Sequence, residues 1–148
     1  MEIAILALGC FWKPEINFSK LDGVVSTEVG YCGGESNNTN YKEVCSGTTN
    51  HAEVVKIKFD SSKVSYENIL KYFFESHNPT TINRQGPDVG SQYRSEIFYS
   101  DNFQKKIAEE VLEKYNKQYN GKIVTKISKI KNYCKAEEYH QKYLEKKF

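Results

Sequence analysis

Four cysteines, Cys10, Cys32, Cys45 and Cys134, are the most nucleophilic side chains of this 148-residue chain. None of them forms the close C-x-x-C pair that structural zinc sites usually contain, so we expect no metal site. Four cysteines are also too few for the dense disulfide framework of a small secreted domain. We therefore expect free thiols in a reducing, cytoplasmic compartment.

Cys10 is the thiol whose position best suits chemistry. It follows an apolar run at residues 3–9 and precedes a helix that should begin near Lys13. Backbone N–H groups and the helix dipole favour a thiolate at such a corner and can lower the thiol pKa. The position fits a buried, unreactive cysteine equally well. Phe11 and Trp12 follow directly, and as an exposed pair they would form a pocket for a small apolar group, whereas core packing is the alternative.

The elements that must position Cys10 follow from the hydrophobic pattern. We expect strands and helices in the order strand, helix, strand, strand, helix, strand, helix, strand, helix. The strands are expected at 3–9, 24–31, 54–59, 94–99 and 123–130, and the helices at 13–22, 66–78, 102–115 and 136–147, with Ser65 and Asp101 as N-caps. Glycine-containing loops should occupy 32–40 and 84–90. This order predicts an α+β fold of the ferredoxin-like αβ-plait type, a mostly antiparallel sheet with helices packed on it.

Composition excludes several classes of protein. The formal charge is +2, from 21 basic and 19 acidic residues, and no basic run is present, so nucleic-acid binding is not indicated. The longest apolar stretch, 3–8, is far shorter than a membrane span. Met1 and Glu2 do not begin a signal-peptide pattern. We expect one domain over 1–148 that contacts neither nucleic acid nor membranes.

The tetrapeptide Gly9-Cys10-Phe11-Trp12 resembles the signature of the class A peptide methionine sulfoxide reductases. Further blocks that resemble this family follow in the family's order at 30–34, 41–47, 51–54, 77–80, 84–95 and 136–141. Together they cover nearly the whole chain, and so many blocks in register are not a chance match. The chain is therefore identified as a member of this family.

The resemblance implies that Cys10 attacks the sulfur of a methionine sulfoxide and ends as a sulfenic acid. It also implies that Glu53 donates the proton that the sulfoxide oxygen needs before it can leave. A carboxyl group keeps a proton near neutral pH only where burial or a nearby anion raises its pKa. Without the resemblance, Glu53 would read as an ordinary surface residue.

The resemblance assigns further roles around the sulfoxide. Tyr41 and Tyr93 match the two hydroxyl donors to the sulfoxide oxygen, and Asp88 matches the aspartate that orients the substrate. Phe11 and Trp12 match the residues that receive its methyl group. Selection of the S-epimer follows if the methyl group and the oxygen each have only one place to go.

The three histidines, His51, His77 and His140, also lie in blocks that resemble the family. We expect them to be structural hydrogen-bonding residues. No spacing in the chain favours a Cys–His pair with a general base.

Turnover requires reduction of the sulfenic acid, which many family members achieve with cysteines in a glycine-rich C-terminal tail. This sequence carries no such cysteines. Cys134 lies in a polar segment and is our candidate resolving thiol. Cys32 fits packing better, and Cys45 reads as a structural cysteine or as a thiol near the site. The alternative is a one-cysteine cycle, in which thioredoxin, or glutathione with glutaredoxin, attacks the sulfenic acid directly.

The leading hypothesis is thus an oxidoreductase without a bound cofactor that repairs methionine S-sulfoxide, free or in proteins. One alternative is a thiol peroxidase that uses Cys10 and would not need Glu53. Another is a non-catalytic module that binds oxidised methionine.

Overall fold

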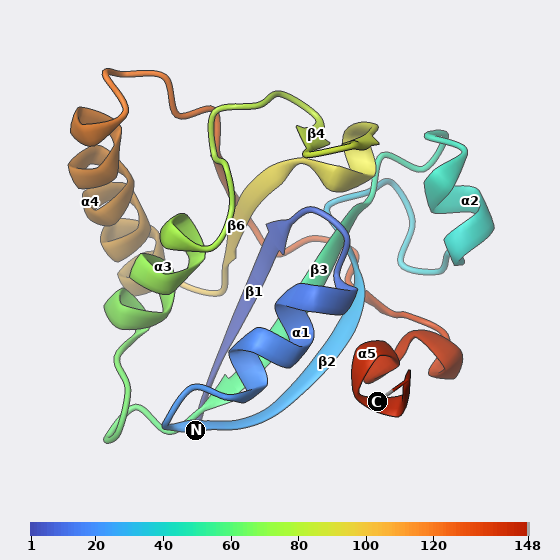
Figure 1. Ribbon diagram of the computed structural model, residues 1–148, viewed down its shortest axis with the longest axis horizontal. Coiled ribbons are helices and arrows are strands. Elements are labelled where there is room, and N and C mark those ends of the chain that lie inside the picture. Colours follow the sequence, from blue (N-terminus) through green and yellow to red (C-terminus); the bar gives the residue numbers. More distant parts are fainter. Residues whose placement is uncertain (148) are drawn as a thin grey trace.

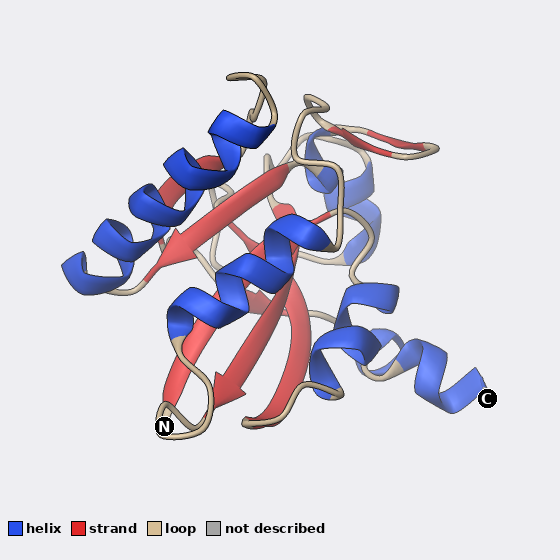
Figure 2. Cartoon of the chain, turned by 60° about the vertical axis from the view of Figure 1, so that its left-hand side comes forward, coloured by secondary structure: helices blue, strands red, loops and turns tan. Residues whose placement is uncertain are grey.

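The computed structural model describes residues 1–147, which form a sheet of six strands in the order β7-β6-β1-β3-β2-β8. The strands are β1 Glu2–Leu8, β2 Val24–Cys32, β3 Ala52–Phe59, β6 Ser95–Tyr99, β7 Lys126–Lys129 and β8 Cys134–Lys135. The helices are α1 Trp12–Ser19, α2 Tyr41–Cys45, α3 Tyr66–Glu75, α4 Asn102–Gln118 and α5 Tyr143–Lys147, with 3₁₀ turns η1 at Ser91–Tyr93 and η2 at Glu138–His140. Two short strands, β4 Arg84–Gln85 and β5 Asp88–Val89, pair with each other and stand apart from the main sheet (Figure 2).

The central four strands, in the order β6-β1-β3-β2, are antiparallel to their neighbours, and β7 joins β6 in parallel. The units β1-α1-β2 and β3-α3-β6 are the two halves of a ferredoxin-like plait. In Figure 1 helix α1 lies in front of the sheet, α3 and α4 stand side by side at the left, and α2 projects at the right. The predicted α+β plait is therefore confirmed.

Strand β1 carries apolar side chains on both faces because both faces of the sheet are covered. Leu6 and Leu8 face the helices and join the larger core cluster. Ile5 and Ala7 face the other way, where the returning chain near Tyr133 covers them. This two-sided burial explains why the sequence is apolar without a break over residues 3–8.

Two predicted helix starts are confirmed by their caps. The side chain of Ser65 accepts a hydrogen bond from the N–H of Asn68, and Asp101 does the same for Gln104. In α4, Phe103 is 63% exposed although apolar residues follow it at every fourth position. Gln104 is buried in its place, because its amide accepts from the Ser100 N–H and donates to the carbonyl of Ile3.

The predicted C-terminal helix over 136–147 is wrong. The chain forms the turn η2 and then the short helix α5, separated by Lys142 with a φ of +54°. The side chain of Gln141 explains the break. It accepts from the N–H of Val29 and donates to the carbonyls of Val29 and Ala136, so this segment is fastened to the edge of β2.

Three smaller differences also concern short elements. Helix α2 follows the predicted loop at 32–40 and begins where Asn40 caps the N–H of Glu43. The predicted loop at 84–90 contains the β4–β5 hairpin, whose turn has Gly86 at a φ of +58°. The strand predicted at 123–130 is shorter in the structure, where β7 covers Lys126–Lys129. Within residues 1–147, no helix combines the length and the apolar character that a membrane crossing requires.

The contacts of Gln141 generate a stability prediction. Gln141→Ala should lower the free energy of unfolding by about 1–3 kcal/mol, because it leaves the buried N–H of Val29 without a partner. Urea unfolding measures the difference, and Gln118→Ala, at an exposed position, is the matched control. Equal stability of Gln141→Ala and the parent would contradict this account.

Candidate active site

Cys10 lies at the corner between β1 and α1, and the shape of this corner depends on glycine. Gly9 has a φ of +99°, a conformation that residues with a side chain rarely adopt. A Cβ atom at this position would also come within 2.9 Å of the side chain of Gln85, on β4. Glycine therefore lets the chain turn sharply and lets the hairpin approach the half-buried thiol of Cys10.

Glu53 lies next to this corner on β3. Its carboxyl is 1% exposed, and Oε1 accepts a hydrogen bond of 3.2 Å from the backbone N–H of Phe11. The structure thus brings the carboxyl to the residue adjacent to Cys10. The second oxygen, Oε2, is buried without a hydrogen-bond partner among the described residues. A protonated carboxyl can hold its hydrogen there and present it to a ligand.

Burial raises the pKa of Glu53 to about 8. The hydrogen bond from the Phe11 N–H acts in the opposite direction, and the charge of Asp88 raises the pKa further. One N–H donor does not compensate for the loss of solvent around a carboxylate. Glu53 is therefore a neutral acid at pH 7, as the resemblance required.

Burial also raises the pKa of Cys10, to about 12. The backbone N–H of Trp12 at the start of α1 lowers this pKa, but the charges of Glu53 and Asp88 add to the effect of burial. Of the two possibilities that the position left open, the protonated thiol applies at rest, because the partial charge of a helix end is smaller than the desolvation of a buried anion. The resting site holds a neutral thiol beside a neutral acid.

The two tyrosines named by the resemblance reach the same site from different elements. Tyr41 begins α2, where its backbone N–H donates to Oε2 of Glu137 over 2.9 Å. Tyr93 ends η1. Burial raises the pKa of Tyr41, and it raises the pKa of Tyr93 to about 12. Nearby groups that include Glu53 raise both pKa values further. Both phenols therefore keep their protons and can donate hydrogen bonds.

The aromatic pair after Cys10 divides between core and surface. Phe11 is 1% exposed and packs against Tyr31, so the alternative of core packing applies to Phe11. Trp12 is half-buried, and its indole stacks on Tyr143 with ring centroids 3.9 Å apart. The N–H of this indole donates to Nδ1 of His140 over 3.0 Å.

His140 is a residue of the site that sequence analysis assigned only a structural role. Its buried ring lies 5.3 Å from that of Phe11 and 4.5 Å from that of Tyr41. Burial lowers its pKa, which keeps the imidazole neutral and able to accept from Trp12. The only signal in the sequence was its place in a block that resembles the family, since Trp12 and His140 are far apart along the chain.

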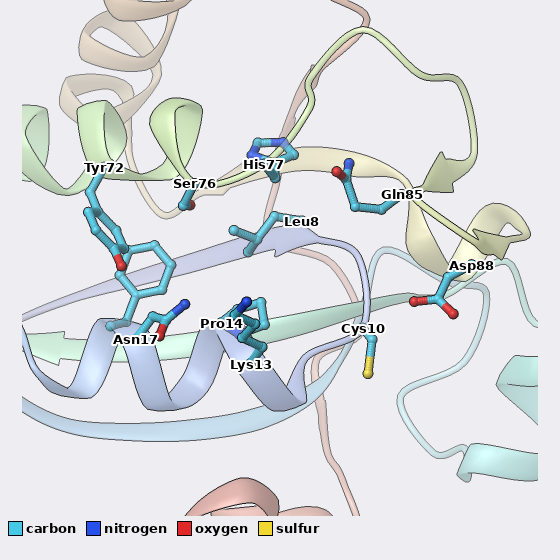
Figure 3. Close-up of a pocket in the computed structure, with 11 residues that line it drawn as sticks. Leu8, Cys10, Lys13, Pro14, Asn17, Tyr72, Ser76, His77, Gln85 and Asp88 are labelled. Carbon is cyan, nitrogen blue, oxygen red and sulfur yellow. The ribbon is translucent and has the colours of Figure 1, made fainter.

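A cavity of about 230 Å³ adjoins Cys10 between α1, the end of α3 and the β4–β5 hairpin. Figure 3 shows Cys10, Gln85 and Asp88 at one end of it and Tyr72 at the other. His77, also in its lining, binds the carbonyl of Phe73 through Nδ1 and Ser95 through Nε2. Burial lowers the pKa of His77 to about 4, so it is a neutral structural residue, as expected.

The other three cysteines are free thiols in different surroundings. Cys32 is fully buried, and its thiol contacts the carbonyl of Lys131. Cys134 is half-buried on β8, with its thiol 3.6 Å from the carbonyl of Thr39. Cys45 is exposed at the end of α2. Among residues 1–147, no group of three or more His, Cys, Asp or Glu side chains is arranged to hold a metal ion.

The raised pKa of Glu53 predicts how stability depends on pH. The folded protein keeps this proton up to about pH 8, whereas the unfolded chain releases it near its ordinary value of 4.5. The stability from this group is therefore complete below pH 4.5 and is lost as pH rises through about 8.

Glu53→Gln has no such group. Between pH 5 and 8 the free energy of unfolding of the parent should fall relative to that of Glu53→Gln by up to about 1.4 kcal/mol for each pH unit. Chemical denaturation across this range tests the prediction. The stability of Glu113→Gln, on the exposed face of α4, should depend on pH as that of the parent does. The same pH dependence in Glu53→Gln and the parent would contradict a buried, protonated Glu53.

Comparisons with known proteins agree with this arrangement. A family model described as peptide methionine sulfoxide reductase matches residues 2–148. The peptide methionine sulfoxide reductase MsrA of Pelagibacter ubique is 65% identical over 147 residues, which cover 99% of this chain and all of the relative. A peptide methionine sulfoxide reductase of Solanum lycopersicum is 51% identical, with coverage of 99% and 75%.

Solved structures extend the comparison. Reduced Mxr1 from Saccharomyces cerevisiae superposes with a TM-score of 0.93 at 38% identity, covering 98% of this chain and 84% of that one. Mxr1 in complex with Trx2 gives a TM-score of 0.68 at 26% identity, with coverage of 96% and 84%. The chain belongs to the peptide methionine sulfoxide reductase family.

Proposed function

We propose that this protein reduces methionine S-sulfoxide, free or within proteins, to methionine, with Cys10 as nucleophile and Glu53 as acid. One observation carries the proposal. A buried, neutral carboxyl group is hydrogen-bonded to the residue next to a thiol, and one of its oxygens has no partner among the described residues. Reduction of a sulfoxide needs this combination, because the sulfur requires a nucleophile and the oxygen requires a proton.

The proposed step conserves protons, electrons and the oxygen atom. Glu53 donates its proton to the sulfoxide oxygen while Sγ of Cys10 attacks the sulfoxide sulfur. The thiol proton replaces the one that Glu53 has given, and the oxygen passes to Cys10, which becomes a sulfenic acid. Methionine sulfur gains the two electrons that the sulfur of Cys10 loses. The high pKa of both groups suits this exchange, because neither has to exist as an isolated anion in the buried site.

The surrounding side chains orient the sulfoxide in this proposal. The hydroxyl groups of Tyr41 and Tyr93 donate to its oxygen as charge develops there. Trp12, with Phe11 behind it, receives the methyl group, and Asp88 holds the substrate beside Cys10. Separate places for oxygen and methyl group select the S-epimer.

The proposal includes the route by which Cys10 is reduced. Since a relative, Mxr1, has been solved with Trx2, we propose a thioredoxin as the reductant. Glutathione with glutaredoxin is the alternative donor. The free cysteines suit a reducing compartment, so we place the protein in the cytoplasm as a monomer formed by one catalytic domain over 1–148.

A single-turnover assay without reductant tests the roles of Cys10 and Glu53. The parent should release about one methionine per protein, Cys10→Ser none, and Glu53→Gln should react about 100- to 10,000-fold more slowly at pH 7. The parent rate should fall as pH rises through about 8, where Glu53 loses its proton, and Glu53→Gln should lack this fall.

Glu113→Gln is the control and should behave like the parent. Methionine release by Cys10→Ser would overturn the assignment. A full parental rate of methionine release in Glu53→Gln would remove the acid from the mechanism.

The two tyrosines generate a separate prediction. The double variant Tyr41→Phe, Tyr93→Phe should lose about 100- to 1,000-fold in the rate of methionine release, because no phenol then donates to the sulfoxide oxygen. Each single variant should lose less, since one donor remains. Rapid-quench kinetics measure these rates, with Tyr99→Phe on β6 as control. An unchanged rate in the double variant would exclude the proposed donors.

A further inference from the structure

Cys45 ends α2, the helix that begins with Tyr41, and the mechanism above does not use it. It follows Tyr41 by one turn of α2, and residues at this spacing share one face of a helix. The ring of Tyr41 contacts that of His140, which in turn contacts Phe11 and Trp12. This chain of aromatic contacts joins the helix that carries Cys45 to the corner that carries Cys10.

The surroundings of the Cys45 thiol include groups that also surround Cys10. Burial and the charge of Glu53 raise the pKa of Cys45, whereas hydrogen bonding to Tyr41 and to the buried amide of Gln92 lowers it. Cys45 is also among the groups whose charge raises the pKa of Cys10. Tyr41 and Glu53 are thus neighbours of the Cys45 thiol, and Glu53 is also hydrogen-bonded to the residue after Cys10.

Helix α2 is lightly anchored. Within Tyr41–Cys45 only Val44 is buried, and the helix continues into Gly47, which has open space around it. A disulfide requires Cα atoms about 4.4–6.8 Å apart, so one partner has to approach the other. An exposed helix of five residues with few buried contacts can make this movement at little free-energy cost.

The other cysteines are less favourably placed. Cys134 is held in register with Tyr31 by the β8–β2 ladder, and the Tyr31 side chain stands between it and Glu53. Two strand spacings, about 10 Å, separate Cys134 from Glu53 across the sheet. Cys32 is fully buried in the cluster on the face away from the helices. Exposure on a short helix therefore favours Cys45 over Cys134, which a strand ladder holds and which is the candidate that the sequence indicated.

We infer that Cys45 is the resolving thiol of this enzyme, an inference that rests on the proposed function. The thiol of Cys45 attacks the sulfenic sulfur of Cys10, a disulfide bond forms, and the S–O bond breaks. The hydroxyl group leaves as water with the proton of Cys45. An external dithiol such as thioredoxin then reduces the Cys10–Cys45 disulfide and is itself oxidised.

The test is one turnover of the fully reduced protein with methionine S-sulfoxide and no reductant. We expect about one methionine per protein, a fall in free thiols from four to two, and a cross-linked peptide containing Cys10 and Cys45. Cys45→Ser should still release methionine but stop at a sulfenic acid that dimedone traps. Its steady-state turnover with thioredoxin should fall at least about tenfold.

Cys134→Ser is the matched control and should form the Cys10–Cys45 disulfide as the parent does. A parent disulfide between Cys10 and Cys134, or a sulfenic acid with three remaining thiols, would overturn the inference and leave the proposed function intact. Failure of the parent to release methionine would instead overturn the proposed function itself.

Discussion

The hydrogen bond between the backbone N–H of Phe11 and the carboxyl of Glu53 is the contact on which the site depends. It joins the middle of the sheet to the entrance of α1, and it places an acid one residue from the thiol of Cys10. Because β3 lies between β1 and β2, the carboxyl is surrounded by core and loses its water. A buried carboxyl with a single N–H donor keeps its proton. The position of Glu53 in the fold therefore determines its chemistry.

The same burial acts on Cys10, and this determines when the thiol becomes reactive. A cysteine exposed at a helix start would be a standing thiolate, open to any oxidant. Here desolvation outweighs the helix start, so the thiol stays protonated until a ligand accepts a proton from Glu53. In the proposed mechanism a sulfoxide activates Cys10 and Glu53 together, because its oxygen can take up that proton.

The sequence predicted best what local patterns determine. Strand β1 and the capped start of α3 depend on hydrophobic runs and on Ser65, and both were confirmed. The C-terminal segment was mispredicted because its shape depends on the contact of Gln141 with β2, which no local pattern records. Cys10 and Glu53 were found through resemblance to a family, and the burial that raises their pKa values came only from the structure. The contact of Trp12 with His140 could not be predicted from local patterns either, since the two residues are far apart along the chain.

The attachment of residues 137–142 to the N-terminal half has a consequence for synthesis on the ribosome. Glu137 binds Tyr31 and the start of α2, His140 orients Trp12, and Gln141 closes the edge of β2. All of these partners emerge from the exit tunnel long before the segment that completes them. A nascent chain therefore carries Cys10 without these contacts until residues 137–142 have left the tunnel. Stalled or truncated products would lack a mature catalytic centre even where the N-terminal strands had already paired.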